Sequence, residues 1–133
     1  MGLVDESNFR VRYAETDQMG MAYYANYLIW MEVGRSDFCR KCGFSYRELE
    51  QQEQAFLTVA EATCRYRAPA RYDDEIVVET ELSRVKTRVV EFIYRIRRGD
   101  TLLAEGSTVH VVIGPDGRPR TMPERYLDLL RRF

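Results

Sequence analysis

The sequence predicts an α+β domain in which one long helix packs against a mostly antiparallel sheet of about five strands. Three observations predict this class. Apolar residues recur at helical spacing over residues 24–42, four later segments alternate apolar and polar residues, and short turns rather than linkers separate them. A chain of 133 residues suits one domain with its own core and is short for two. Residues 1–133 are therefore expected to form a single domain.

The first expected element is a strand over residues 9–13, where apolar residues alternate with arginines. Residues 16–26 break this pattern and are expected to be irregular. The long helix over residues 24–42 follows. Asn26 is a candidate N-cap, because its side-chain oxygen can accept an unpaired N–H group of the first turn. Gly43 suits the left-handed residue that often ends a helix.

A short helix over residues 46–52 and four strands are expected next. The strands span residues 56–67, 76–82, 90–96 and 102–113. Because each alternates in polarity and the turns are short, we expect an antiparallel meander. Pro123 then suits the first position of a terminal helix. One helix covers only part of such a sheet, and an open sheet has two edges, so oligomers are expected.

The composition argues against several classes of protein. The 20 basic and 21 acidic side chains nearly balance, unlike a protein that binds nucleic acid by neutralising phosphates. No run of about 18 apolar residues is present to span a membrane. Residues 1–10 lack the apolar core of a secretory signal, and three cysteines, an odd number, favour free thiols in a reducing compartment. We therefore expect a cytoplasmic protein.

Cysteine and histidine offer only weak candidates for chemistry. Cys39 and Cys42 have the CxxC spacing, and Cys64 and His110 would complete four zinc ligands. The CxxC pair lies on the predicted helix, so plain thiols are the better interpretation, and no metal or other cofactor is expected. His110 alternates with valines on the last predicted strand, which favours a structural role. Glu61, on an earlier strand, is a candidate for a second carboxylate.

Asp17 is the carboxylate best placed for chemistry. It lies in the irregular segment, shortly before Gly20 and the predicted start of the helix. The first N–H groups of a helix are unpaired and carry the positive end of its dipole, so they can polarise a carbonyl group. Asp17 and these N–H groups together would place a nucleophile or general base beside an oxyanion hole. The alternative is that Asp17 only satisfies N–H groups of a tight loop.

The run from Tyr13 to Tyr27 resembles the signature of the 4-hydroxybenzoyl-CoA thioesterase and YbgC-like branch of the hotdog superfamily. That signature reads Asp, two residues, Gly, two residues, Tyr, two residues, Asn, Tyr, as in Asp17 to Tyr27. The resemblance continues to the turn at residues 68–74 and covers nearly the whole chain. It implies a hotdog fold, with a curved antiparallel sheet wrapped around the long helix. It also implies homodimers, often paired into homotetramers, with active sites at the dimer interface.

The same resemblance implies hydrolysis of an acyl-CoA or acyl-carrier-protein thioester. By position, Asp17 would attack the thioester carbonyl or activate water, and the backbone N–H near Tyr24 would polarise that carbonyl. The other signature residues are expected to shape the substrate site: Gly20, Tyr23, Asn26 and Tyr27. Many members of this branch have histidine where this chain has Tyr24, so a second titratable group beside the thioester is missing here.

Arg84, Lys86 and Arg88 bracket a predicted turn and are candidates to bind the phosphates of coenzyme A, with a solvated turn as the alternative. Two other functions stay open. A non-catalytic oligomeric module would bind acyl chains or partner proteins in the same groove, although a pure binder has little reason to desolvate Asp17. A hotdog hydratase or dehydratase would need a histidine beside a carboxylate, and His110 lies on the final predicted strand.

Overall fold

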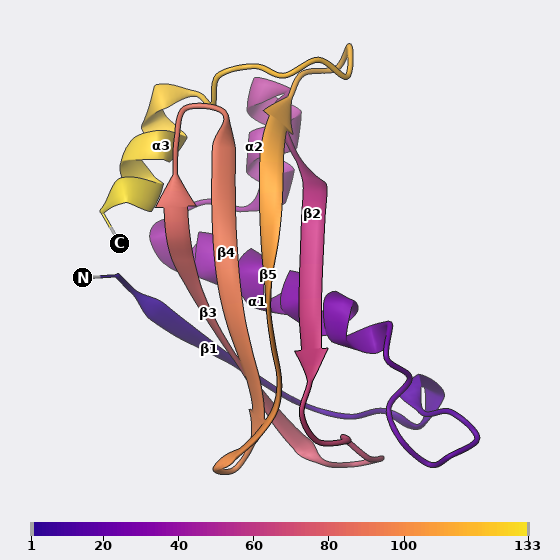
Figure 1. Cartoon of the computed structure of the whole chain (residues 1–133). Coiled ribbons are helices and arrows are strands. Elements are labelled where there is room, and N and C mark those ends of the chain that lie inside the picture. The colour runs from indigo at the N-terminus through magenta and orange to yellow at the C-terminus, as the bar shows by residue number, and fades with distance from the viewer. Residues whose placement is uncertain (1, 133) are drawn as a thin grey trace.

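The computed structural model describes residues 2–132, which form a sheet, three α-helices and one short 3-10 helix (Figure 1). The elements in chain order are β1 (Val4–Arg10), η1 (Tyr13–Glu15), α1 (Asn26–Cys42), α2 (Tyr46–Glu53), β2 (Phe56–Tyr66), β3 (Glu75–Val85), β4 (Val89–Arg98), β5 (Thr101–Ile113) and α3 (Glu124–Arg131). This order confirms the predicted α+β class with one long helix.

The strands form one antiparallel sheet in the order β1-β3-β4-β5-β2. β3, β4 and β5 follow one another as hairpins, but the predicted four-strand meander is wrong at its first strand. β2 pairs with β5 instead of β3, so the chain crosses the end of the sheet between them (Figure 1). Alternation along a strand records which face is buried, not which strand lies beside it.

Helix α1 crosses one face of the sheet and packs mainly against β1 and β3 (Figure 1). It buries Trp30, Met31 and Phe38, while β4 contributes Phe92 and Ile96, and each of these side chains is at most 2% exposed. Burying side chains of this size supplies about 1.5–3 kcal/mol each. This core holds the start of α1 against the sheet and so positions the loop that precedes it.

The N-terminal strand lies earlier than predicted, at Val4–Arg10 instead of residues 9–13. The chain turns after Arg12 because the Glu15 carboxylate accepts the Arg12 N–H at 2.7 Å, and a 3-10 turn forms there. Val11 is nevertheless buried, as the alternation predicted. Tyr13, which the same pattern placed on the buried face, is 77% exposed, because the strand has already ended and Tyr13 begins the 3-10 turn. The polarity pattern was therefore right about burial at Val11 and wrong at Tyr13.

The helix ends follow the predictions in part. Gly43 adopts a φ of 116° and ends α1, as predicted. The prediction that Asn26 is the N-cap is wrong, because Asn26 is the first residue of α1 and follows Ala25 at the cap position. Its side-chain Nδ2 instead donates to the Glu15 carbonyl oxygen at 2.7 Å. Pro123 occupies the N-cap of α3, one position earlier than predicted.

Edge strand β2 and helix α1 both present apolar side chains to solvent in the single chain. Edge strand β2 is exposed along most of its length, and its Val59 is 48% exposed. On α1, Leu28 and Ile29 are 40% and 52% exposed. Over residues 2–132, no helix is both long enough and apolar enough to cross a membrane.

Candidate active site

The segment around Asp17 folds into a tight loop. Thr16 and Ala22 form an isolated antiparallel bridge, and the Asp17 N–H donates to the Met21 carbonyl at 2.8 Å. Gly20 donates back to the Asp17 carbonyl at 3.0 Å and has a φ of 78°, a conformation that side chains other than glycine rarely adopt. Gly20 therefore closes the loop through its backbone conformation.

The Asp17 carboxylate has one oxygen committed to this loop. Its Oδ1 accepts the N–H groups of Met19 at 2.9 Å and of Met21 at 3.3 Å. This is the loop-stabilising role that the sequence left open as an alternative. Its Oδ2 accepts no hydrogen bond from the part of the chain described here, and the residue is half-buried. One carboxylate oxygen is thus held in place, while the other has no hydrogen-bond donor within residues 2–132.

The start of α1 offers backbone donors beside this carboxylate. Tyr23 donates its N–H to the Glu15 carbonyl at 2.8 Å. The next two N–H groups, of Tyr24 and Ala25, donate to no acceptor within residues 2–132. Unpaired N–H groups at a helix N-terminus carry partial positive charge and favour a developing oxyanion.

Asp17 and Tyr24 line the same pocket, which has a volume of about 340 Å³. Its other lining residues are Met19, Met21, Ala22, Tyr27, Tyr66, Arg67, Ala68 and Pro69. The lining is mostly aromatic, aliphatic and thioether, so the carboxylate stands in largely apolar surroundings. The residues after β2 complete the pocket because the chain there passes beside the Asp17 loop, where Ala22 donates to the Ala70 carbonyl at 2.8 Å.

Glu15 supports the loop, a role that was not predicted from the sequence. Its carboxylate accepts the indole N–H of buried Trp30 at 3.0 Å, and its carbonyl accepts from Tyr23 and Asn26. Burial by itself would raise the pKa of Glu15, but the hydrogen bonds from Arg12 and Trp30 outweigh burial and lower it. Glu15 therefore ties the loop to the core as a carboxylate.

The other signature residues surround the pocket in different ways. Tyr27 is buried, and its hydroxyl accepts the Ala70 N–H at 3.2 Å. Tyr23 is 47% exposed and packs against Tyr24 with tilted rings, whose centroids are 4.7 Å apart, but it does not line the pocket. Gly20 and Asn26 act on the loop and the helix start, as described above. Tyr66 and Arg67 line the pocket but were not predicted as site residues. Their only visible feature in the sequence was their position at the end of a predicted strand.

Arg84, Lys86 and Arg88 lie at the β3–β4 hairpin, at the opposite end of the sheet from the Asp17 loop (Figure 1). Arg84 pairs with Glu91 at 3.9 Å. Within one chain the structure does not bring these residues to the pocket. Their role in binding coenzyme A phosphates stays a prediction.

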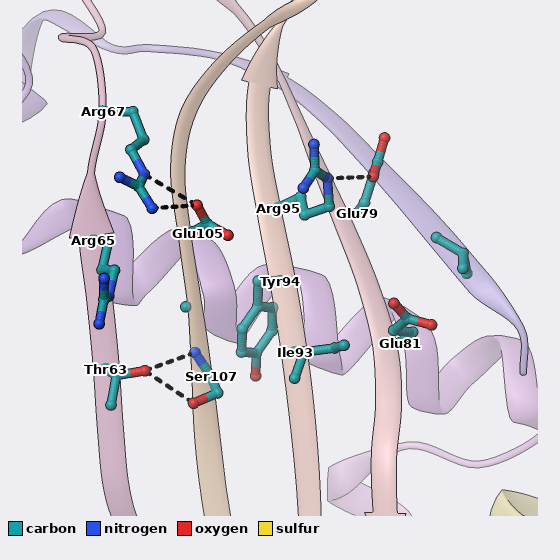
Figure 2. A pocket seen from close by; sticks show the side chains of 12 residues that line it. Thr63, Arg65, Arg67, Glu79, Glu81, Ile93, Tyr94, Arg95, Glu105 and Ser107 are labelled. Atoms are coloured by element: carbon teal, nitrogen blue, oxygen red, sulfur yellow. Dashed lines mark hydrogen bonds and ion pairs between the residues drawn. The ribbon is translucent and has the colours of Figure 1, made fainter.

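A larger hollow of about 610 Å³ lies on the outer face of the sheet, away from α1 (Figure 2). Charges of both signs line it, and Figure 2 shows Arg67 beside Glu105 and Arg95 beside Glu79, with N–O distances of 2.8 and 3.6 Å. Exposed pairs of this kind contribute little free energy and satisfy one another. Arg65 and Glu81 also line the hollow and form no ion pair within residues 2–132 (Figure 2). The hollow is a solvated sheet face of mixed charge.

The remaining candidates lie outside the Asp17 pocket. His110 is fully buried with Nε2 2.8 Å from Thr108 Oγ1, and burial together with Arg35 lowers its pKa to about 4. The thiols of Cys39 and Cys42 are free, and burial raises the pKa of Cys42 to about 11. In the described part of the chain, His, Cys, Asp and Glu side chains form no group of three that could hold a metal ion. Glu61 lies on exposed β2, away from the pocket lining.

The chain matches a known protein family. The model of the thioesterase superfamily matches residues 19–111, which include most of the pocket and all of α1. The chain belongs to the thioesterase superfamily. The acyl-CoA thioester hydrolase YbgC of Escherichia coli is 34% identical over 117 residues, covering 86% of this chain and 87% of YbgC.

Two further comparisons bear on the extent of the similarity. YneP of Bacillus subtilis is 43% identical over 77 residues, so the match spans 58% of this chain and only 55% of YneP. A hypothetical protein of Thermus thermophilus superposes with a TM-score of 0.92 at 35% identity, covering 98% of this chain and 97% of that one. The resemblance to the hotdog thioesterases and the predicted hotdog fold are confirmed.

Proposed function

We propose that this thioesterase-superfamily protein hydrolyses an acyl-CoA or acyl-carrier-protein thioester, with Asp17 as its catalytic carboxylate. One observation carries the proposal. Asp17 and Tyr24 line one mostly apolar pocket, and the Tyr24 N–H has no hydrogen-bond acceptor within residues 2–132. A carboxylate and backbone donors around a space of this kind suit a reaction in which negative charge develops on a carbonyl oxygen.

Two routes fit the geometry. Asp17 Oδ2 attacks the thioester carbonyl carbon, expels the thiolate and forms an acyl-enzyme anhydride that water then hydrolyses. Alternatively, Asp17 takes a proton from a water molecule that attacks the same carbon, and the proton passes to the leaving thiolate. In both routes the N–H of Tyr24 stabilises the oxyanion, and the products are a free acid and a thiol. No metal or redox cofactor enters either route.

We further propose that the working unit is a homodimer, or a homotetramer built from such dimers, in the cytoplasm. The exposed edge of β2 has unpaired backbone groups, and the neighbouring α1 surface has Leu28 and Ile29 exposed. An edge strand of 11 residues is a template for pairing with another chain. A second copy on this edge would enclose the adjoining pocket and exclude water from it.

The alternative function is a non-catalytic module that binds an acyl chain in the same pocket. The observation in its favour is that Asp17 Oδ1 already serves the loop, through the N–H groups of Met19 and Met21. In that case the carboxylate would matter for folding and not for turnover. A hydratase or dehydratase is disfavoured, because buried His110 does not reach the pocket.

The deciding experiment measures free coenzyme A released from a panel of short, long and aromatic acyl-CoA substrates. Asp17→Asn keeps the loop acceptor Oδ1 but removes the negative charge, so we expect turnover to fall by about 10²- to 10⁴-fold. Asp116→Asn is the matched control, because Asp116 also accepts a loop N–H, from Arg118 at 3.0 Å, far from the pocket.

Proteins are compared at the same oligomeric state. Full activity in Asp17→Asn would remove Asp17 from the mechanism. A wild type that binds these substrates without releasing thiol, and is equally inert towards acyl-carrier-protein thioesters, would support the binding module instead.

A further inference from the structure

Tyr66 is the last residue of β2, and it joins the sheet to the start of α1. Its hydroxyl donates to the Tyr24 carbonyl oxygen at 2.9 Å, across 42 residues of sequence. Its ring meets those of Tyr24 and Tyr27 edge-on, with centroids 6.4 and 5.0 Å apart. The same side chain lines the Asp17 pocket. Tyr66 is thus both a wall of the pocket and a hydrogen-bond donor to the helix start.

Glu15 also supports the start of α1, because its carbonyl accepts the Tyr23 N–H and the Asn26 side chain, but neither bond involves the Tyr24 carbonyl. Ala25 occupies the N-cap position, and no side chain caps the helix. The Tyr24 carbonyl also receives the Tyr27 N–H, but at 3.3 Å, a longer contact than the bond from Tyr66. Helix ends without a cap fray readily, because their first N–H groups have no partner within the helix. An external hydrogen bond to this carbonyl therefore restrains the peptides of Tyr24 and Ala25.

The bond also acts on the donors themselves. The Tyr24 carbonyl and the Ala25 N–H belong to one peptide group, so a hydrogen bond accepted by the oxygen strengthens the N–H as a donor. The Tyr24 N–H lies on the other side of the same Cα, and holding the carbonyl limits its rotation. Burial and the neighbouring Cys64 raise the pKa of Tyr66, so the phenol stays protonated and donates at neutral pH.

We propose that the Tyr66 hydroxyl is a positioning group that aims and strengthens the oxyanion donors at the start of α1. This inference rests on the proposed thioester hydrolysis and adds a residue from β2 to it. The Tyr66 ring forms a wall in either case, so the hydroxyl is the part to remove. Tyr66→Phe keeps the wall and deletes only the hydrogen bond.

The test measures kcat and KM of Tyr66→Phe on the best acyl-CoA substrate, together with the carbonyl ¹³C chemical shift of Tyr24. We expect kcat to fall by about 10-fold, less than for loss of a direct oxyanion donor, with little change in KM. The Tyr24 carbonyl shift should move as its hydrogen bond is lost. Tyr72→Phe is the control, since Tyr72 is 57% exposed, packs on Tyr13 and does not line the pocket.

The outcomes are separable. If Asp17→Asn is inactive while Tyr66→Phe matches Tyr72→Phe in kcat, the inference fails and the proposed function stands. If the wild type has no turnover, the proposed function and this inference both fail. An unchanged Tyr24 carbonyl shift in Tyr66→Phe would overturn the hydrogen bond itself, whatever the kinetics show. If Tyr66→Phe is partly unfolded at the assay temperature and the fall in kcat matches the fraction of folded protein lost, Tyr66 only stabilises the fold.

Discussion

Single residues near the pocket do more than one task. Asp17 holds its own loop through one oxygen and leaves the other open, while Glu15 ties that loop to Trp30 in the core. Tyr66 forms a wall and holds a carbonyl at the same time. Because these tasks share side chains, conservative substitutions that keep shape are the informative ones at this scale.

His110 makes stability depend on pH. Its pKa is about 4 in the folded chain and near 6.5 when unfolded, because the site is buried beside Arg35, Phe92 and Thr108. Above pH 6.5 the ring is neutral in both states. As pH falls from 6.5 towards 4, the unfolded chain binds the proton first, so the free energy of unfolding falls, by about 3 kcal/mol in total.

His110→Gln should therefore flatten the loss of stability between pH 6.5 and 4, measured by urea denaturation at several pH values. The quantity to compare is the slope of the free energy of unfolding against pH in the variant and in the wild type. Absolute stabilities are not compared, since the substitution also disturbs the contact with Thr108. Parallel slopes in the two proteins would show that other groups cause the pH dependence.

At the scale of elements, the packing of α1 on β3 depends on Gly34. A Cβ at this position would clash with Thr80 Oγ1 and lie 2.9 Å from Val78 Cγ1. Overpacking costs about 1–3 kcal/mol, and the better helix propensity of alanine offsets roughly 1 kcal/mol of that. We therefore expect Gly34→Ala to lower the free energy of unfolding by up to about 2 kcal/mol. Denaturant titration checks this value.

Ser36→Ala, on the same helix but bonded only to Glu32, is the comparison for Gly34→Ala and should change stability little. A Gly34→Ala variant as stable as the wild type would mean that α1 can shift away from β3 at no cost. Since the loop of Asp17 leads directly into α1, such a shift would also move the pocket.

At the scale of the whole molecule, we expect edge strand β2, and not edge strand β1, to form the dimer interface. Val59 on β2 and Val4 on β1 are each 48% exposed, so they form a matched pair of sites. If dimers form through β2, Val59→Lys should yield monomers with reduced turnover, because a buried charge blocks edge pairing. Val4→Lys should change neither, as measured by light scattering and thioester hydrolysis. Monomers from Val4→Lys alone would place the interface on β1.

Local sequence determined much of this protein. Spacing over residues 24–42 predicted α1, alternation predicted β3, β4 and β5, and Gly43 ended its helix as expected. Each of these features follows from the period of a helix or strand or from one backbone conformation, which neighbouring residues suffice to specify. The Asp17 loop was visible for the same reason, because the aspartate, the glycine and the helix start lie within a few residues of one another.

Only the tertiary structure decided which distant segments meet. It placed β2 beside β5, and the Asn26 side chain within hydrogen-bond distance of the Glu15 carbonyl. It also brought Tyr66 to the start of α1 and left Arg84 at the β3–β4 hairpin, which lies at the far end of the sheet (Figure 1). A polarity pattern states that a residue is buried or exposed and is silent on its partner. Strand order and long-range hydrogen bonds depend on packing of the whole chain, so local sequence does not reveal them.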